Sequence, residues 1–181
     1  MARPACQRGQ KGGWLSEERG YSRVGNQRSG CRVGACFPRG RYRTVTAHLG
    51  GQLTRYLLDT TALIDFSKGR EPAQSRIMSM IDAGDELGIC AINVTEFYAG
   101  IPQEERALWD EFVGSLAYWE ITWDIARQAG YLRYDFARRG QILSTTDTLV
   151  AAVAWQRGAT IVTDNMKHYP FKEVSLLSLR P

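Results

Sequence analysis

Acidic residues recur downstream of residue 53 in positions that would allow several of them to share a divalent cation. Asp59 and Asp164 each follow a short apolar run directly, whereas Glu96 and Asp147 lie in segments of helical character. Carboxylates that meet within a few ångströms repel one another and raise one another's pKa unless a cation neutralises them. Mg²⁺ suits such a group because it is a hard ion that takes oxygen ligands and keeps several waters.

Each of these acids also has an ordinary structural explanation when it is considered alone. Asp59 has the position of a helix N-cap, whose side-chain oxygen accepts a hydrogen bond from the first turn. Glu96 follows Asn93 by three residues and Asp147 follows Ser144 by three, which is the spacing of a capping box. Local sequence alone is compatible with both capping and metal binding for these three acids.

The predicted secondary structure favours convergence of the acids at one place. Strands are predicted over 56–59, 87–92, 118–122, 160–163 and 174–179, and a turn or helices over 60–68, 72–83, 93–99, 102–116, 123–139 and 147–156. Alternating strands and helices indicate an α/β fold with a mainly parallel sheet covered on both faces, because parallel strands need helical crossovers. Sites in such sheets collect at the carboxyl ends of the strands.

At that edge Asp59 and Asp164 would end strands, and Glu96 and Asp147 would open helices. Asp164 and its neighbour Asn165 are also common turn residues, so a plain turn is a further interpretation of this pair. Separate structural roles, however, do not explain why the acids would gather at one edge of the sheet. We therefore expect an acidic, metal-binding site there.

Composition divides the chain near residue 52. Residues 1–52 hold ten Lys and Arg, two acids and ten of the eighteen glycines, whereas residues 53–181 hold thirteen Lys and Arg and seventeen acids. We interpret 1–52 as a disordered tail or as translation from a start codon placed too far upstream, with a nucleic-acid-binding arm as an alternative. The folded domain is expected over 53–181.

The four cysteines show no disulfide framework or C-x-x-C motif. Cys31 and Cys36 with His48 match no common zinc-finger spacing, and Cys90 lies in an apolar run as a small hydrophobic residue would. No apolar run reaches the roughly 18 residues of a membrane span, and no signal-peptide pattern is present. A cytoplasmic protein is expected.

Four segments together resemble the successive motifs of PIN domains, and in particular those of the VapC toxins of prokaryotic toxin–antitoxin systems. The motifs are LLDTTALID at 57–65, TEFYAG at 95–100, TDTLVAA at 146–152 and IVTDNMKHY at 161–169. The similarity covers residues 55–181 with order and spacing intact, and none of residues 1–52. It implies a PIN-like three-layer α/β/α fold with a short, mainly parallel central sheet.

The resemblance also implies roles for individual residues. Asp59 and Asp147 would be the principal metal ligands, and Glu96 and Asp164 would complete the catalytic acids. Thr61, Thr163 and Asn165 would line the site. Many relatives have an acid two residues after the strand-ending Thr, where this chain has Asn165 with Asp164 one residue earlier. Which of the two fills the fourth acidic position is left open.

The implied activity is hydrolysis of RNA phosphodiester bonds with Mg²⁺, for which Mn²⁺ would substitute. Candidate RNA-binding cations are Arg138, Arg139 and Lys167, whereas His168 would be a structural residue. A VapB-like antitoxin and a homodimer are the implied partners, and four tryptophans of the domain are expected in the core or at such interfaces. The alternatives are a non-catalytic PIN-like module that binds RNA or protein, and a phosphatase, which Thr61 at the second acid's position disfavours.

Overall fold

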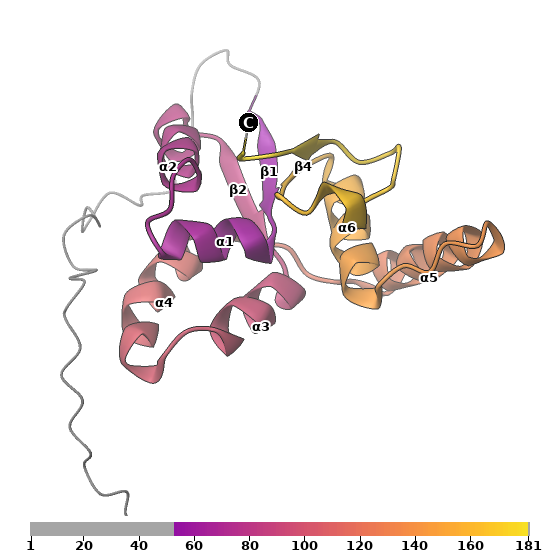
Figure 1. Ribbon diagram of the computed structural model, residues 1–181, viewed down its shortest axis with the longest axis horizontal. Coiled ribbons are helices and arrows are strands. Elements are labelled where there is room, and N and C mark those ends of the chain that lie inside the picture. The colour runs from indigo at the N-terminus through magenta and orange to yellow at the C-terminus, as the bar shows by residue number, and fades with distance from the viewer. Residues whose placement is uncertain (1–52, 181) are drawn as a thin grey trace, which may run out of the picture. The chain divides into compact units, whose positions relative to one another are not determined.

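The computed structural model describes residues 53–180, which form a five-stranded sheet between helices (Figure 1). The strands are β1 (Arg55–Leu58), β2 (Glu86–Ile89), β3 (Ala117–Tyr118), β4 (Thr160–Val162) and β5 (Leu176–Leu177). Their order is β3-β2-β1-β4-β5, and every neighbouring pair is parallel. The expectations about the basic extension 1–52 and about Cys31, Cys36 and His48 lie outside the described residues.

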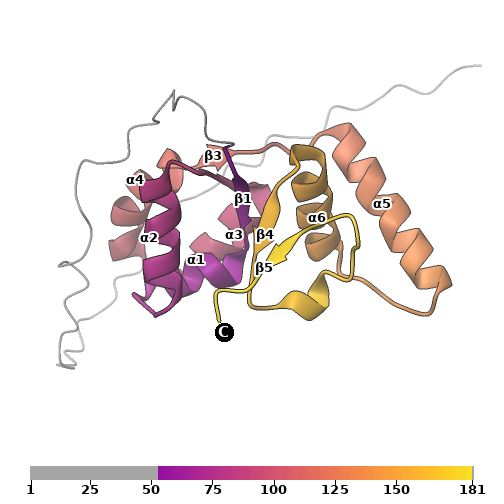
Figure 2. The same ribbon diagram turned by 90° about the horizontal axis from the view of Figure 1, so that it is seen from above.

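Helices cover both faces of this sheet, which confirms the predicted three-layer α/β/α architecture. The helices are α1 (Thr60–Ser67), α2 (Ala73–Ala83), α3 (Ala91–Ala99), α4 (Arg106–Ser115), α5 (Trp123–Arg138) and α6 (Thr145–Arg157). Figure 2 shows α1 to α4 on one side of the strands and α5 and α6 on the other. None of the helices in this part of the chain has the length and hydropathy needed to cross a lipid bilayer.

Alternating residues of the central strands divide the core into two halves. Leu57 of β1 and Ile161 of β4 pack toward α5 and α6, whereas Leu58 and Val162 pack toward the layer of α1, α2 and α4. All four side chains are fully buried, as expected for parallel strands that are covered on both faces. This packing fixes the ends of β1 and β4, where Asp59 and Thr163 begin the loops.

The start of α3 differs from the prediction, which began this helix at Asn93. Cys90 is the N-cap instead, and Asn93 is the third helical residue. The Asn93 Oδ1 accepts hydrogen bonds from the backbone N–H and from the thiol of Cys90, both at 3.1 Å. An Asn can cap a helix or reach back from its first turn, and here it reaches back. Cys90 is a fully buried free thiol, as predicted.

Further segments differ from their predicted extents, and the strands predicted over 87–92 and 174–179 are observed as the shorter β2 and β5. The predicted helix over 102–116 is split into a short 3₁₀ turn, Gln103–Glu105, and α4. The predicted strand over 118–122 is reduced to β3, because Thr122 already caps α5 by accepting a hydrogen bond from the Ile125 N–H at 3.4 Å. None of these segments contains Asp59, Glu96, Asp147 or Asp164.

Gly88 in β2 is required by a close approach between the sheet and Trp119. A Cβ atom at position 88 would lie 2.5 Å from the Trp119 ring, which is 3% exposed. We expect Gly88→Ala to lower the free energy of unfolding by about 1–3 kcal/mol, the usual cost of overpacking a core. Urea denaturation followed by circular dichroism measures this change.

Gly130→Ala in α5 is the matched control, because a Cβ there meets nothing within 4 Å. This variant should be more stable by up to about 1 kcal/mol, the helix propensity gained on replacing glycine. If Gly88→Ala were as stable as the unmodified chain, the tight contact with Trp119 would not constrain the fold.

Candidate active site

The candidate site lies at the carboxyl edge of the sheet. Asp59 directly follows β1, and Thr163 directly follows β4. Parallel pairing places Leu58 opposite Val162, and the Asp59 N–H donates to the Val162 carbonyl at 3.0 Å. The sheet register therefore brings residues that are about a hundred positions apart in the sequence into one site.

Asp59 is the buried centre of the site, with 8% exposure. Its Oδ1 accepts hydrogen bonds from the Thr60 N–H at 2.8 Å and the Tyr169 hydroxyl at 3.2 Å. Its Oδ2 accepts from the hydroxyls of Thr163 at 2.7 Å and Thr61 at 3.2 Å. Such donors are what a buried carboxylate requires. Asp59 is also the N-cap of α1, so capping and a place in the site coexist.

Glu96 joins Asp59 through Thr60. The Thr60 hydroxyl donates to Glu96 Oε2 at 2.7 Å, while the Thr60 backbone N–H binds Asp59. The capping-box interpretation of Glu96 is wrong, because α3 begins at Ala91 and Glu96 lies beyond its first turn. Glu96 is exposed, so solvent reaches its carboxylate.

Asp147 is the third acid of the group. Ser144 caps α6 by accepting a hydrogen bond from the Asp147 N–H at 3.4 Å, as its spacing predicted. The Asp147 Oδ2 lies 3.1 Å from the His168 Nδ1. Burial, together with the negative charges of Asp59 and Glu96, raises the Asp147 pKa, although His168 opposes this shift. The three acids therefore share one electrostatic environment.

Tyr169 and Thr60 are site residues that the sequence patterns did not predict. The Tyr169 side chain is 3% exposed, and burial, followed by the charges of Asp59 and Asp147, raises its pKa far above the ordinary value. The hydroxyl is therefore a neutral donor to Asp59. Tyr169 is the last residue of the fourth motif and Thr60 lies within the first. Membership of these motifs is therefore the sequence feature that could have indicated either residue.

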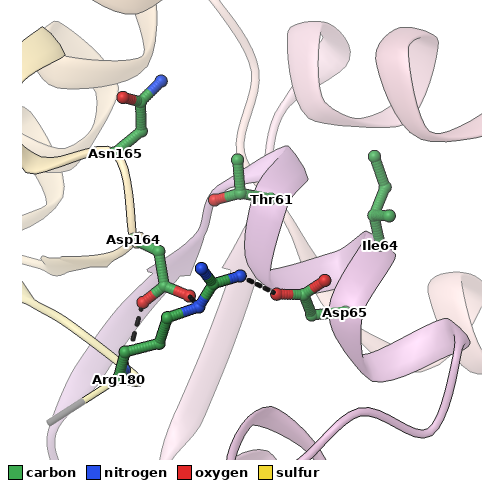
Figure 3. Close-up of a pocket in the computed structure, with 6 residues that line it drawn as sticks. All are labelled: Thr61, Ile64, Asp65, Asp164, Asn165 and Arg180. Atoms are coloured by element: carbon green, nitrogen blue, oxygen red, sulfur yellow. Dashed lines mark hydrogen bonds and ion pairs between the residues drawn. The ribbon is translucent and has the colours of Figure 1, made fainter.

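Asp164 and Asn165 follow β4 but point in different directions (Figure 3). Asp164 Oδ1 accepts hydrogen bonds from the backbone N–H groups of Leu179 at 3.0 Å and Arg180 at 3.2 Å. Its Oδ2 pairs with the Arg180 Nε at 2.9 Å. The Asn165 Nδ2 lies 3.0 Å from the His168 Nδ1. Asp164 thus binds the C-terminal segment, and the catalytic role that the sequence predicted for it is untested.

The basic residues predicted to bind RNA are exposed. Arg138 ends α5, and the Arg139 guanidinium lies 5.4 Å from the Phe136 ring centroid. Lys167 belongs to the short turn Met166–His168, next to the histidine that contacts Asp147. Their contacts with RNA stay predictions.

The donor set fits a hard divalent cation. Residues 53–180 contain no group of three His, Cys, Asp or Glu side chains already arranged to enclose an ion. Mg²⁺ does not require such a cage, since it is commonly held through one or two carboxylates, with waters and substrate phosphate completing its shell. The charges of Asp59 and Glu96 raise the pKa of Asp147, and a bound cation would oppose that repulsion.

Asp147 in this site should lower the stability of the metal-free protein. Because its folded-state pKa is raised, the folded state binds a proton more tightly than the unfolded state, and stability falls as pH rises through that pKa. We expect Asp147→Asn, in EDTA at pH 7, to raise the melting temperature. The gain should shrink as pH is lowered toward the ordinary range of Asp.

Asp135→Asn, on the exposed side of α5, is the control and should change stability by less than about 0.5 kcal/mol. Thermal unfolding at several pH values measures both variants. A lower melting temperature for Asp147→Asn at pH 7 would contradict the electrostatic picture of the site.

Comparison with known proteins agrees with this fold. The family model described as PIN domain matches residues 56–175. Ribonuclease VapC19 of Mycobacterium tuberculosis is 32% identical over 116 residues, which cover 63% of this chain and 91% of that protein. The tRNA(fMet)-specific endonuclease VapC of Shigella flexneri is 25% identical over 122 residues, covering 65% of this chain and 91% of that protein.

Solved structures share the fold. VapBC2 from Rickettsia felis, bound to a DNA fragment from its promoter, superposes with a TM-score of 0.61 and 21% identity, covering 69% of this chain and 98% of the other. DNA-bound VapBC from Salmonella typhimurium gives a TM-score of 0.60 and 20% identity, covering 70% and 99%. The family match over about two thirds of its length shows that the chain belongs to the PIN-domain family, with VapC ribonucleases among its relatives.

Proposed function

We propose that this protein is a metal-dependent endoribonuclease and the toxin of a VapBC-type toxin–antitoxin pair. The observation that carries the proposal is the group of Asp59, Glu96 and Asp147 at the carboxyl edge of the sheet, where the three charges act on one another. The relatives named as ribonucleases support RNA as the substrate. Complexes named VapBC support an antitoxin as the partner.

In this proposal Asp59 and Asp147 hold the ion, and Mg²⁺ is the expected metal, with Mn²⁺ able to replace it because both prefer carboxylate and water oxygens. The ion supplies Lewis-acid polarisation of the phosphoryl oxygen and a more acidic attacking water. Hydroxyls of Thr61, Thr163 and Tyr169 fix the orientation of Asp59. These donors keep one carboxylate in place before substrate arrives.

Glu96 and His168 have supporting roles in the same scheme. Glu96 is the exposed acid and is anchored through one oxygen to Thr60, so it is positioned to orient a water or to accept its proton. His168 contacts Asp147 and orients that carboxylate. No Ser, Cys or His nucleophile is needed in this mechanism.

Exposed aromatic residues on α5 support a protein partner. Trp123 is 80% exposed, and Tyr131 and Tyr134 are exposed on the same helix, whereas Trp109 and Trp119 are buried in the core. Aromatic residues are enriched in protein interfaces. We include this face of α5 among the surfaces at which a second copy or an antitoxin would bind.

RNA cleavage by the full chain tests the proposed function. A pool of structured RNAs should be cut with Mg²⁺ or Mn²⁺ and left intact in EDTA. Asp59→Asn should lower the cleavage rate by roughly 100-fold or more, because metal catalysis contributes several kcal/mol and each 1.4 kcal/mol is tenfold. Asp135→Asn, with a similar change of charge on α5, should cleave normally. A folded protein without metal-dependent cleavage would favour the non-catalytic PIN-like module.

The Asp164→Asn variant tests whether Asp164 is a catalytic acid or a structural one. We expect this variant to cleave saturating RNA at a near-normal rate, because its carboxylate binds Leu179 and Arg180 rather than the acidic group. Its unfolding free energy should fall by about 1–3 kcal/mol, as hydrogen bonds to a mostly buried charge are weakened. A loss of cleavage as large as that of Asp59→Asn, with unchanged stability, would assign Asp164 to the metal site instead.

A further inference from the structure

A pocket of about 290 Å³ lies beside the acidic group and is not used by the proposed chemistry. It is lined by Thr61, Ile64, Asp65, Asp164, Asn165 and Arg180 (Figure 3). Two lining residues also belong to the site: the Thr61 hydroxyl donates to Asp59 at 3.2 Å, and the Asn165 N–H donates to the Thr163 hydroxyl at 3.0 Å. The pocket is therefore continuous with the site.

Arg180 makes two ion pairs at this pocket, although its side chain is 64% exposed. Its Nε pairs with Asp164 at 2.9 Å, and its Nη2 pairs with Asp65 at 3.2 Å. In Figure 3 the remaining guanidinium nitrogen points toward the space between Thr61 and Asn165. Two carboxylates thus bind two nitrogens of the guanidinium and leave the third on the side of Thr61 and Asn165.

The two carboxylates do not leave the pocket with a net negative charge. The second oxygen of Asp65 pairs with Arg70 at 2.7 Å. Burial raises the Asp65 pKa, but hydrogen bonds and charges from Arg70 and Arg180 outweigh burial and hold this pKa below its ordinary value. Within the pocket two acids are thus matched by two guanidiniums, so the repulsion that an approaching phosphate meets comes from the neighbouring acidic group and not from Asp65 or Asp164.

We propose that this pocket is a subsite for the RNA strand next to the scissile bond, in which Arg180 donates to a backbone phosphate. Arginine suits this task because its planar fork donates in several directions at once. Ile64 supplies an apolar wall against which a ribose or base packs. The inference rests on the proposed ribonuclease function and makes Arg180 a substrate-binding residue.

A purely structural role for Arg180 is the competing explanation, because its contacts tie the C-terminal segment to α1. Arg70 provides the matched comparison. It pairs with the same Asp65 and its side chain is similarly exposed, at 55%, but Arg70 does not line the pocket. Loss of either guanidinium removes one ion pair from Asp65. Loss of Arg180 also removes the ion pair with Asp164 and a donor from the pocket, and Arg180→Lys, which keeps the positive charge, controls for the unpaired Asp164.

Binding of a fluorescein-labelled single-stranded RNA of random sequence to the full chain tests the subsite. Fluorescence anisotropy in EDTA, over a series of salt concentrations, should show severalfold weaker binding for Arg180→Gln than for Arg70→Gln. The slope of log K against log salt should fall by about 0.7 for Arg180→Gln, the value of one phosphate contact on a single strand. Arg180→Lys should keep the slope, since it keeps the charge.

Cleavage kinetics provide the second measurement. Arg180→Gln should raise KM and leave kcat unchanged, as expected when binding common to ground state and transition state is removed. Equal RNA affinities and salt slopes for Arg180→Gln and Arg70→Gln would overturn the subsite and leave Arg180 as a structural tether. Differential binding without metal-dependent cleavage by the unmodified chain would retain the subsite and reject the nuclease function, so the two failures are distinguishable.

Discussion

The burial of the Asp59 carboxylate at the end of β1 is the constraint on which the rest of the site depends. A carboxylate that is 8% exposed must find hydrogen-bond donors inside the protein. Its donors come from the start of α1, from the end of β4 and from Tyr169, which lies 110 residues away in the sequence. Only a parallel β1–β4 pair in the observed register supplies them together. The sheet therefore supports the core and also orders the first carboxylate before any ligand arrives.

Once Asp59 is fixed, the remaining acids add charge at an energetic cost. Asp147 is partly buried near Asp59 and Glu96, and its raised pKa measures the penalty of ionising it there. His168 reduces this penalty from one side. A fold selected only for stability would not keep such a group, whereas a site that must bind a cation needs it. In the proposed function the mutual repulsion of these acids serves cation binding, and stability is lower at the place where chemistry is proposed.

Sequence patterns predicted the features that follow from local hydrophobic periodicity and from the rule that sites collect at the carboxyl ends of parallel strands. The apolar runs ending at Leu58 and Val162 and the helices after them gave the α/β class and the convergence of Asp59, Glu96 and Asp147. The start of α3 was misplaced because the Asn93 side chain suits two positions in a capping box. The direction of Asp164 was not predictable, because it depends on where the C-terminal segment lies. Likewise, Arg180 reaches Asp65 across 115 residues, and nothing local marks that contact.

The excess negative charge of the domain affects both substrate binding and inhibition. Residues 53–181 carry more acids than cations, so the domain as a whole repels RNA, and attraction must come from a bound ion and from local cations such as Arg180. In the proposed mechanism the negative group binds a cation, and the same charge would attract a basic side chain from an antitoxin. Such a side chain would neutralise the acids without supplying a metal-bound water. An inhibitor of this kind would stabilise the fold by relieving the repulsion at Asp147 while preventing cleavage, so inhibition and metal binding would compete for the same negative charge.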